Sequence, residues 1–244
     1  MTPWPCPRWI AHRGAGKLAP ENTLAAFRLG ARHGYRAFEC DVKLSADGVP
    51  FLLHDATLER TSNGRGKAGE CSWHDLSRLD AGGWHSRAYA GEPLPSLQAI
   101  AAFVQRNGFA LDIEIKPSPG SDTHTGAVVA AEVARLWHGH ERMPLLSSFQ
   151  PDALRAARAV APELPRALLL DQLPLDVIEH AEQLGCVAVI TDHKLMDAAL
   201  IARLHAAGQR ALVYTVNEPE RAQQLLAGGI DGIVTDAVDR FVPD

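Results

Sequence analysis

Short apolar runs alternate with longer amphipathic segments from one end of the chain to the other. The short runs are typical of buried strands, and we expect strands at residues 9–12, 38–42, 110–116, 145–149, 167–171, 187–191, 211–216 and 232–235. The longer segments repeat their apolar positions with helical spacing, and we expect helices at residues 23–33, 97–106, 125–137, 151–160, 175–183, 197–206 and 219–226. The pattern therefore predicts repeated strand–helix units along the whole chain.

Glycines follow five of the expected helices, where a left-handed backbone conformation favours this residue. They are Gly34, Gly108, Gly185, Gly208 and Gly228. Strand–helix alternation at this spacing favours a parallel sheet in an α/β fold. Eight units without an internal boundary favour a closed (β/α)₈ TIM barrel, and the length of 244 residues suits that fold. An open doubly wound sheet is the alternative, although no GxGxxG motif follows the first strand.

One segment departs from this rhythm. Residues 43–96 separate the second expected strand from the next helix, and a plain loop of a barrel is much shorter. A turn at residues 46–48 joins the second strand to another extended piece at residues 49–54. We expect the following residues, about 56–94, to form a small insertion on the catalytic face of a single domain that spans residues 1–244.

Composition excludes several classes of protein. The net charge is −5 and no run of Lys or Arg occurs, so a nucleic-acid surface is not expected. The four cysteines show no CxxC spacing, and we expect them to be free thiols in a reducing compartment. The start of the chain, from Met1 to Pro5, lacks the character of a signal peptide, and no apolar stretch approaches the roughly 20 residues of a membrane span. We therefore expect a cytoplasmic protein without a membrane span, whose oligomeric state the sequence leaves open.

Acidic residues occupy the carboxyl ends of two expected strands, where a barrel places its active site. Side chains alternate along a strand, so Glu39 and Asp41 share one face, and Glu114 occupies the same kind of position two expected elements later. Three carboxylates in a partly dry cavity repel one another, and a hard divalent cation such as Mg²⁺, Ca²⁺ or Mn²⁺ would relieve that repulsion. The alternative is a network of ion pairs with the neighbouring Arg13 and Lys116.

Two histidines end extended segments that should lie close together. Histidine as a residue type changes its charge near neutral pH, so the pair of His12 and His54 could serve as general base and general acid at a phosphorus centre. Zinc ligation by the pair is a further alternative. Arg13 and Lys116 bring positive charge to the same place, and both residue types bind phosphate oxygens.

A short polar motif lies at the start of the first expected helix, near the carboxyl ends of the expected strands. It runs Pro20-Glu21-Asn22-Thr23. Either Asn22 or Thr23 could simply cap the helix, because both side chains accept a hydrogen bond from the first turn. A role in the site is the other interpretation, and the sequence leaves both open.

Taken together, these pieces resemble the glycerophosphodiester phosphodiesterases, in particular the bacterial cytoplasmic type. The motifs that carry the resemblance are His12-Arg13-Gly14, Pro20-Glu21-Asn22-Thr23, Glu39-Cys40-Asp41-Val42, Asp47-Gly48-Val49-Pro50, His54-Asp55, Arg60-Thr61, Asn63-Gly64, Leu79-Asp80-Ala81-Gly82, Ile113-Glu114-Ile115-Lys116, Ser147-Ser148-Phe149, Thr215-Val216-Asn217 and Gly229-Ile230-Asp231-Gly232. Each motif alone is a weak signal, but they follow the order of the family over nearly the whole chain.

The resemblance implies a (β/α)₈ barrel with a small insertion after the second strand. It implies that His12 and His54 are the catalytic pair and that Arg13 and Lys116 bind the phosphate. It further implies a small-molecule glycerophosphodiester as substrate, cleaved through a cyclic phosphate to glycerol 3-phosphate and an alcohol. Tyr214 stands where many members carry Trp beside the substrate, which puts the headgroup preference in doubt more than the catalysis.

By the same resemblance, Glu39, Asp41 and Glu114 hold the metal ion, Mg²⁺ or Ca²⁺.

Two other functions fit the same residues. The first is a lysophospholipase D-like or inositol phosphodiesterase on the same fold, for which Trp73 and Trp84 of the insertion could form an apolar rim. The second is a non-catalytic phosphate-binding module. The second is disfavoured because each proposed catalytic and metal position carries a competent residue.

Overall fold

The computed structural model describes residues 6–243. The first five residues, from which we expected no export signal, lie outside this range. Among the described residues, no helix combines the length and the apolar character needed to cross a bilayer.

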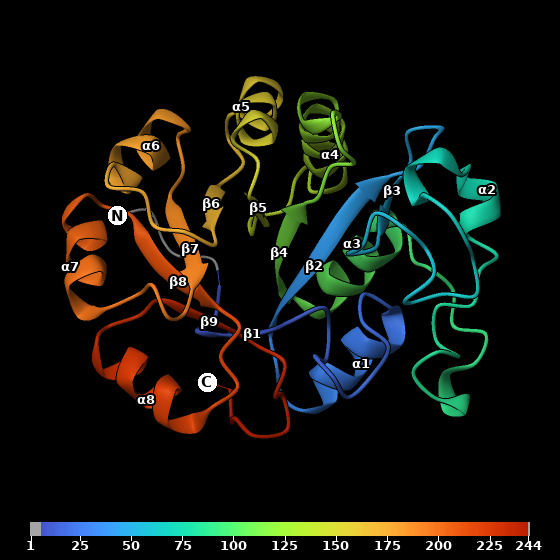
Figure 1. The fold of residues 1–244 in the computed structure, drawn as a ribbon, viewed down its shortest axis with the longest axis horizontal. Helices are drawn as coiled ribbons and strands as arrows, with labels where there is room; N and C mark the ends of the chain where they lie inside the picture. Colours follow the sequence, from blue (N-terminus) through green and yellow to red (C-terminus); the bar gives the residue numbers. More distant parts are fainter. Residues whose placement is uncertain (1–5, 244) are drawn as a thin grey trace.

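The strands of the described residues form one sheet that closes on itself (Figure 1). Their bounds are β1 Trp9–Ala11, β2 Ala37–Leu44, β3 Pro50–Leu52, β4 Ala110–Ile115, β5 Leu145–Ser148, β6 Arg166–Leu170, β7 Ala188–Asp192, β8 Arg210–Tyr214 and β9 Gly232–Thr235. Neighbouring strands are parallel from β4 to β9 and onward to β1, and Ala11 of β1 pairs with Phe38 of β2. This last pairing closes the barrel, so the open doubly wound sheet is wrong.

Helices surround the barrel in the order that the periodicity predicts. Their bounds are α1 Leu24–Arg32, α2 Trp73–Leu76, α3 Leu97–Asn107, α4 Asp122–Leu136, α5 Pro151–Val160, α6 Val177–Gln183, α7 Ala198–Ala206 and α8 Pro219–Ala227. The short α2 lies in the insertion and was not predicted. Four of the five glycines have the positive φ that we expected, but Gly228 has φ −75° and the next residue, Gly229, has φ +88°. Helix α8 is therefore one residue longer than its sequence pattern indicates.

Alternation along the strands separates two apolar clusters. The outward side chains, among them Phe38, Cys40 and Ile113, pack against the helices. The inward side chains form a second cluster inside the barrel, which includes Ile10 and Leu212. Both faces of the strands are therefore buried, as a barrel covered by helices requires.

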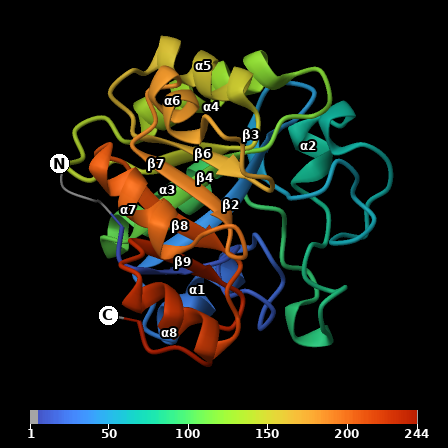
Figure 2. The ribbon, with the colours of Figure 1, turned by 60° about the vertical axis from the view of Figure 1, so that its left-hand side comes forward.

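The insertion lies beside β2 and β3, to one side of the barrel (Figures 1 and 2). It begins after β3, the extended piece that we expected at residues 49–54, which pairs antiparallel with β2. It contains α2 and two 3₁₀ turns, Ala68–Glu70 and Arg87–Tyr89, and its apolar side chains, such as Leu76, form a small cluster with Phe51 of β3. Glu92 accepts a hydrogen bond from the backbone of Ala25, so the insertion is attached to the first turn of α1.

Candidate active site

A cavity of about 240 Å³ opens at the carboxyl ends of the barrel strands. Seven of the eight residues proposed from the sequence line it: His12, Arg13, Glu39, His54, Glu114, Lys116 and Tyr214. The eighth, Asp41, is fully buried and contacts two of them, Arg13 and Lys116. The fold therefore brings all of the predicted site residues together.

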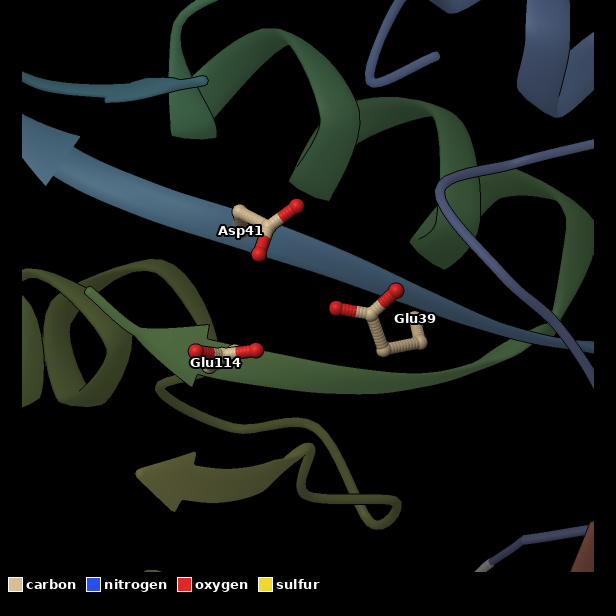
Figure 3. A group of neighbouring side chains, drawn as sticks. All are labelled: Glu39, Asp41 and Glu114. Carbon is tan, nitrogen blue, oxygen red and sulfur yellow. The ribbon is translucent and has the colours of Figure 1, made fainter. Parts of the chain in front are cut away.

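Glu39, Asp41 and Glu114 converge on one point (Figure 3). One carboxylate oxygen of each lies within 4.8 Å of the others, and all three residues are buried. The register of the sheet explains the cluster, because Asp41 of β2 pairs with Glu114 of β4, and Glu39 precedes Asp41 by one period of the strand.

The surrounding cations do not balance these three charges. Burial and the nearby Asp41 raise the pKa of Glu39 well above its usual range, and the same two causes raise the pKa of Glu114 to about 7. Burial also acts to raise the pKa of Asp41, but Arg13 and Lys116 outweigh it and hold that pKa below its ordinary value.

The cluster has the chemistry of a site for a hard divalent cation. Oδ1 of Asp41 is buried and has no hydrogen-bond partner among the described residues, although Nζ of Lys116 lies 3.3 Å away. A buried oxygen of this kind, in an all-carboxylate set, suits Mg²⁺ or Ca²⁺. Among residues 6–243 this is the one such group, and it contains no histidine, which disfavours zinc ligation by His12 and His54.

Two residues with left-handed backbones hold the carboxylates in place. Among the described residues, only Arg13 (φ 49°) and Asn22 (φ 59°) have positive φ without being glycine. The backbone N–H of Arg13 donates to Glu39 over 3.0 Å, and its Nε lies 3.1 Å from Oδ2 of Asp41. The side chain of Asn22 both donates to Asp41 and accepts from its backbone N–H, over 2.8 and 3.1 Å. Strained backbone at a functional site is expected when it positions such groups.

The residues of the motif Pro20-Glu21-Asn22-Thr23 therefore have different roles. Thr23 is the cap of α1, since its hydroxyl accepts from the backbone of Ala26. Asn22 belongs to the site, and Glu21 accepts from Arg13 over 2.7 Å. Glu21 also pairs with Arg60 of the insertion, so this carboxylate joins the barrel to the insertion. Capping is therefore confirmed for Thr23, and a role in the site stays a prediction, which the contact of Asn22 with Asp41 supports.

His12 is held by an aspartate that we did not assign. Its Nδ1 lies 2.6 Å from Oδ1 of Asp236, directly after β9, and its Nε2 lies 3.7 Å from Oε2 of Glu39. The hydrogen bond from His12 keeps the pKa of Asp236 below its ordinary value, against the opposing effect of burial, which is the largest single contribution. An ionised carboxylate can only accept, so Nδ1 of His12 carries the proton and Nε2 is left as the acceptor. Asn217 accepts from the backbone of Asp236 and fixes it.

His54 has a similar but more exposed support. Its Nδ1 lies 2.6 Å from Oδ1 of Asp55, the next residue. Two hydrogen bonds from Arg60 hold Asp55 and keep its pKa below the ordinary value. Burial lowers the pKa of His54, and the opposing effect of Asp41 is smaller. Nδ1 of each histidine thus donates to an aspartate, which leaves Nε2 as the ring nitrogen available for proton transfer.

An aromatic wall faces the carboxylates. Tyr214 at the end of β8 contacts Phe149 edge-to-face, with ring centroids 5.7 Å apart, and its hydroxyl donates to the carbonyl of Leu170. The ammonium of Lys116 lies 5.8 Å from the Phe149 ring centroid and 2.8 Å from Glu114. Phe149, which the sequence motifs included without a role, is therefore part of the site.

A fourth carboxylate lies deeper in the same cavity. Asp112 shares the inward face of β4 with Glu114, and its side chain accepts from the hydroxyl of Ser147 over 2.7 Å. Burial raises its pKa to about 7. The alternation that identified Glu114 also placed Asp112 on this face, but no property of the sequence indicated how deep in the barrel it would lie.

Comparison with known proteins agrees with this geometry. A model of the glycerophosphoryl diester phosphodiesterase family matches residues 12–240. A glycerophosphodiester phosphodiesterase of Caldanaerobacter subterraneus subsp. tengcongensis is 30% identical, over 96% of this chain and 95% of its own. One from Bacillus altitudinis is also 30% identical, over 96% of each chain. The fold is similar to that of an Oleispira antarctica phosphodiesterase solved in complex with the product sn-glycerol-3-phosphate, with 33% identity, a TM-score of 0.89, and coverage of 96% of this chain and 95% of that one.

Proposed function

The chain belongs to the glycerophosphoryl diester phosphodiesterase family, and on that basis we propose that it hydrolyses glycerophosphodiesters to sn-glycerol 3-phosphate and an alcohol. The observation that carries the proposal is the cavity in which two histidines, two cations and a carboxylate cluster meet. A non-catalytic phosphate-binding module needs the cations but neither the histidines nor the carboxylates.

The carboxylate cluster would hold a divalent metal ion, Mg²⁺ or Ca²⁺. When bound by Glu39, Asp41 and Glu114, such an ion neutralises phosphate charge and lowers the pKa of a hydroxyl of glycerol. Arg13 and Lys116 line the same cavity and bind the non-bridging phosphate oxygens. Tyr214 forms the opposite wall, where its ring lies against the substrate.

The two histidines exchange protons with the substrate. Nε2 of His12 takes the proton of the 2-hydroxyl of glycerol, whose oxygen forms a bond to phosphorus. As the bond from phosphorus to the alcohol breaks, His54 gives that oxygen a proton and a cyclic phosphate remains. The negative charge of the phosphate favours the protonated form of His54 before this step.

The second stage reverses both roles. His54 takes a proton from water as its oxygen bonds to phosphorus, and His12 returns a proton to the 2-oxygen as the ring opens. Asp236 and Asp55 keep each imidazole in the tautomer that these transfers require.

A direct test follows glycerol 3-phosphate release from glycerophosphocholine, with and without EDTA. We expect release that EDTA abolishes and that Mg²⁺ or Ca²⁺ restores. A second substrate, the phosphodiester of 1,3-propanediol, lacks the 2-hydroxyl and should turn over far more slowly, while its binding weakens less. Equal turnover of both substrates would mean that water attacks phosphorus directly.

Lysophospholipids and inositol phosphodiesters are the competing substrates. Trp73 packs against Phe51, with ring centroids 6.1 Å apart, so it adds little to an apolar rim, whereas Trp84 is 41% exposed. Hydrolysis of lysophosphatidylcholine against glycerophosphocholine distinguishes the two classes of substrate. We also propose that residues 1–244 act as one catalytic domain in the cytoplasm.

A further inference from the structure

Two hollows flank the central cavity, one beside each histidine. The hollow beside His12 measures about 260 Å³ and is also lined by Lys17, Glu21, Trp84 and Asp236. The hollow beside His54 measures about 420 Å³. It shares its lining with the central cavity at His54, Glu114, Lys116 and Phe149, and we call it the His54 groove. Each hollow adjoins the central cavity and has room for the leaving alcohol of a diester whose phosphate lies in that cavity.

Lys43 is the feature that distinguishes the His54 groove. It follows Asp41 by one strand period, so it lies on the same face of β2 as the carboxylates, and it lines the groove. The residue is only 2% exposed. Its ammonium donates one hydrogen bond, to the carbonyl of Lys116 over 3.2 Å. Within the described part of the chain it has no ion pair within 4.0 Å.

A buried ammonium with a single neutral acceptor is an unfavourable arrangement. An ammonium has three N–H donors, and leaving donors unpaired away from water costs free energy. Asp55 also lines the groove but is engaged by His54 and Arg60. The remaining N–H donors of Lys43 are therefore available to an acceptor that enters the groove.

We propose that the His54 groove binds the leaving alcohol and that Lys43 selects headgroups with hydrogen-bond acceptors, namely polyols and anionic groups. This inference rests on the proposed function. Hydroxyl, carboxylate and phosphate oxygens accept from an ammonium, and an anionic group is also attracted to Lys43 and Lys116. A quaternary ammonium has no acceptor and carries the same charge as the two lysines.

The hollow beside His12 differs mainly in its aromatic group. It too has two carboxylates and two cations, but it presents the indole of Trp84, which is 41% exposed and attracts a quaternary ammonium. Binding of the alcohol in the His54 groove and binding in the hollow beside His12 thus predict different headgroup preferences of the enzyme. The measured headgroup preference therefore shows which of the two hollows receives the alcohol. The His54 groove also places the alcohol next to His54, the residue that we propose protonates it.

The test compares kcat/KM for two probes, the diester of two glycerols joined by one phosphate, and glycerophosphocholine. The wild-type enzyme should favour the diglycerol diester. Lys43→Met has nearly the same shape without the donor, and it should lower kcat/KM for the diglycerol diester about tenfold or more, the usual worth of a hydrogen bond to a charged group. Glycerophosphocholine should change by less than about threefold, so the substrate preference is lost.

Lys17→Met, in the other hollow, is the matched control and should leave the ratio of the two rates unchanged. Thermal unfolding of Lys43→Met checks that the fold is intact. An equal loss on both probes would overturn the inference, because Lys43 would then act on the common phosphate. A ratio that changes in Lys17→Met or Trp84→Ala instead would assign the alcohol to the hollow beside His12. Absence of glycerol 3-phosphate from both probes in the wild type would contradict the proposed function itself.

Discussion

The two ends of the barrel interior differ sharply although the same strands line both. At the amino ends of β2 and β4 the inward residues are Ala37 and Ala110, which face each other in the sheet. Two strand periods later the inward residues of the same strands are Asp41 and Glu114. One end packs small and apolar side chains, and the other gathers charge.

The difference shows how stability and chemistry are separated in this fold. Apolar side chains such as Ile10, Leu145 and Leu212 are almost completely buried and hold the strands together. Burial and the charge of Asp41 raise the pKa values of Glu39 and Glu114 at the other end, so these two groups oppose folding at neutral pH while no ligand is bound. A region that opposes folding is expected where function requires it. Substitutions at the charged end should therefore change mainly activity and metal binding, and substitutions at the apolar end should change mainly the stability of the fold.

The largest expected effect comes from the charged end. Glu39→Gln and Asp41→Asn should each weaken metal binding and lower kcat by orders of magnitude, since both remove a charged metal ligand. Glu39→Gln should leave the melting temperature of the metal-free protein unchanged or raised, because it removes repulsion. Activity assays and thermal melts of the same samples check both statements. Full activity of either variant, or of the wild type in excess EDTA, would contradict the metal site.

Next in size are the histidines. His12→Ala and His54→Ala should each lower turnover roughly 10²–10⁴-fold, the usual worth of a positioned acid or base. Their melting temperatures should change little, because neither side chain belongs to an apolar cluster. His74→Ala, an exposed histidine of α2, is the control and should keep full activity. A variant of His12 or His54 with near wild-type turnover would assign that residue a structural role.

The apolar end should give the opposite result. Leu212→Ala creates a cavity next to Gly232 and Ile10, and should lower the free energy of unfolding by about 2–5 kcal/mol. Urea denaturation measures this loss. The kcat of the folded variant should remain within about twofold of the wild type, because no group at this end reaches the substrate. A large loss of kcat without loss of stability would mean that the two ends are coupled.

The smallest effect is a dependence on pH. The pKa of Glu114 rises from 4.5 to about 7, so this group binds a proton in the metal-free fold that the unfolded chain has already released. Metal-free stability should therefore fall as pH increases from 4.5 to about 7, and metal affinity should increase over the same range, by at most about tenfold per pH unit for each proton displaced.

Thermal melts in EDTA at pH 5 and pH 8, and calorimetric titration with Mg²⁺, measure the two trends. Glu114→Gln cannot titrate and should weaken the decline in stability. A metal-free protein that is more stable at pH 8 than at pH 5 would contradict the raised pKa.

Much of the site could be predicted because strands are periodic. Alternation along the strands put Glu39, Asp41 and Glu114 on the inner face. Because a barrel has its active site at the carboxyl ends of its strands, His12 and Lys116 were expected at that site. Two residues that we did not assign satisfy the same two criteria. Asp236 directly follows the expected strand at residues 232–235, and Lys43 lies one period beyond Asp41, so both residues could have been identified.

Other parts of the site carry no local signal. Asn22 could cap a helix or hold Asp41, and both uses suit its side chain equally well. Which of the two uses occurs depends on the left-handed backbone at Asn22 and on the contact of its side chain with Asp41 of β2. Arg60 reaches Glu21 across 39 residues of sequence, through an insertion without periodicity, and that contact in turn fixes Asp55 beside His54.

The sequence by itself determined the class of fold, the order of the strands and the face on which each charged side chain lies. These properties follow from the periods of two and 3.6 residues, which are local and repeat along the chain. Only the tertiary structure decided which carboxylate oxygen of the cluster lacks a hydrogen-bond partner among residues 6–243, which aspartate holds each histidine, and that the buried Lys43 lines a groove together with His54. Those properties depend on distances between segments that are remote in sequence, and such distances exist only once the sheet has closed.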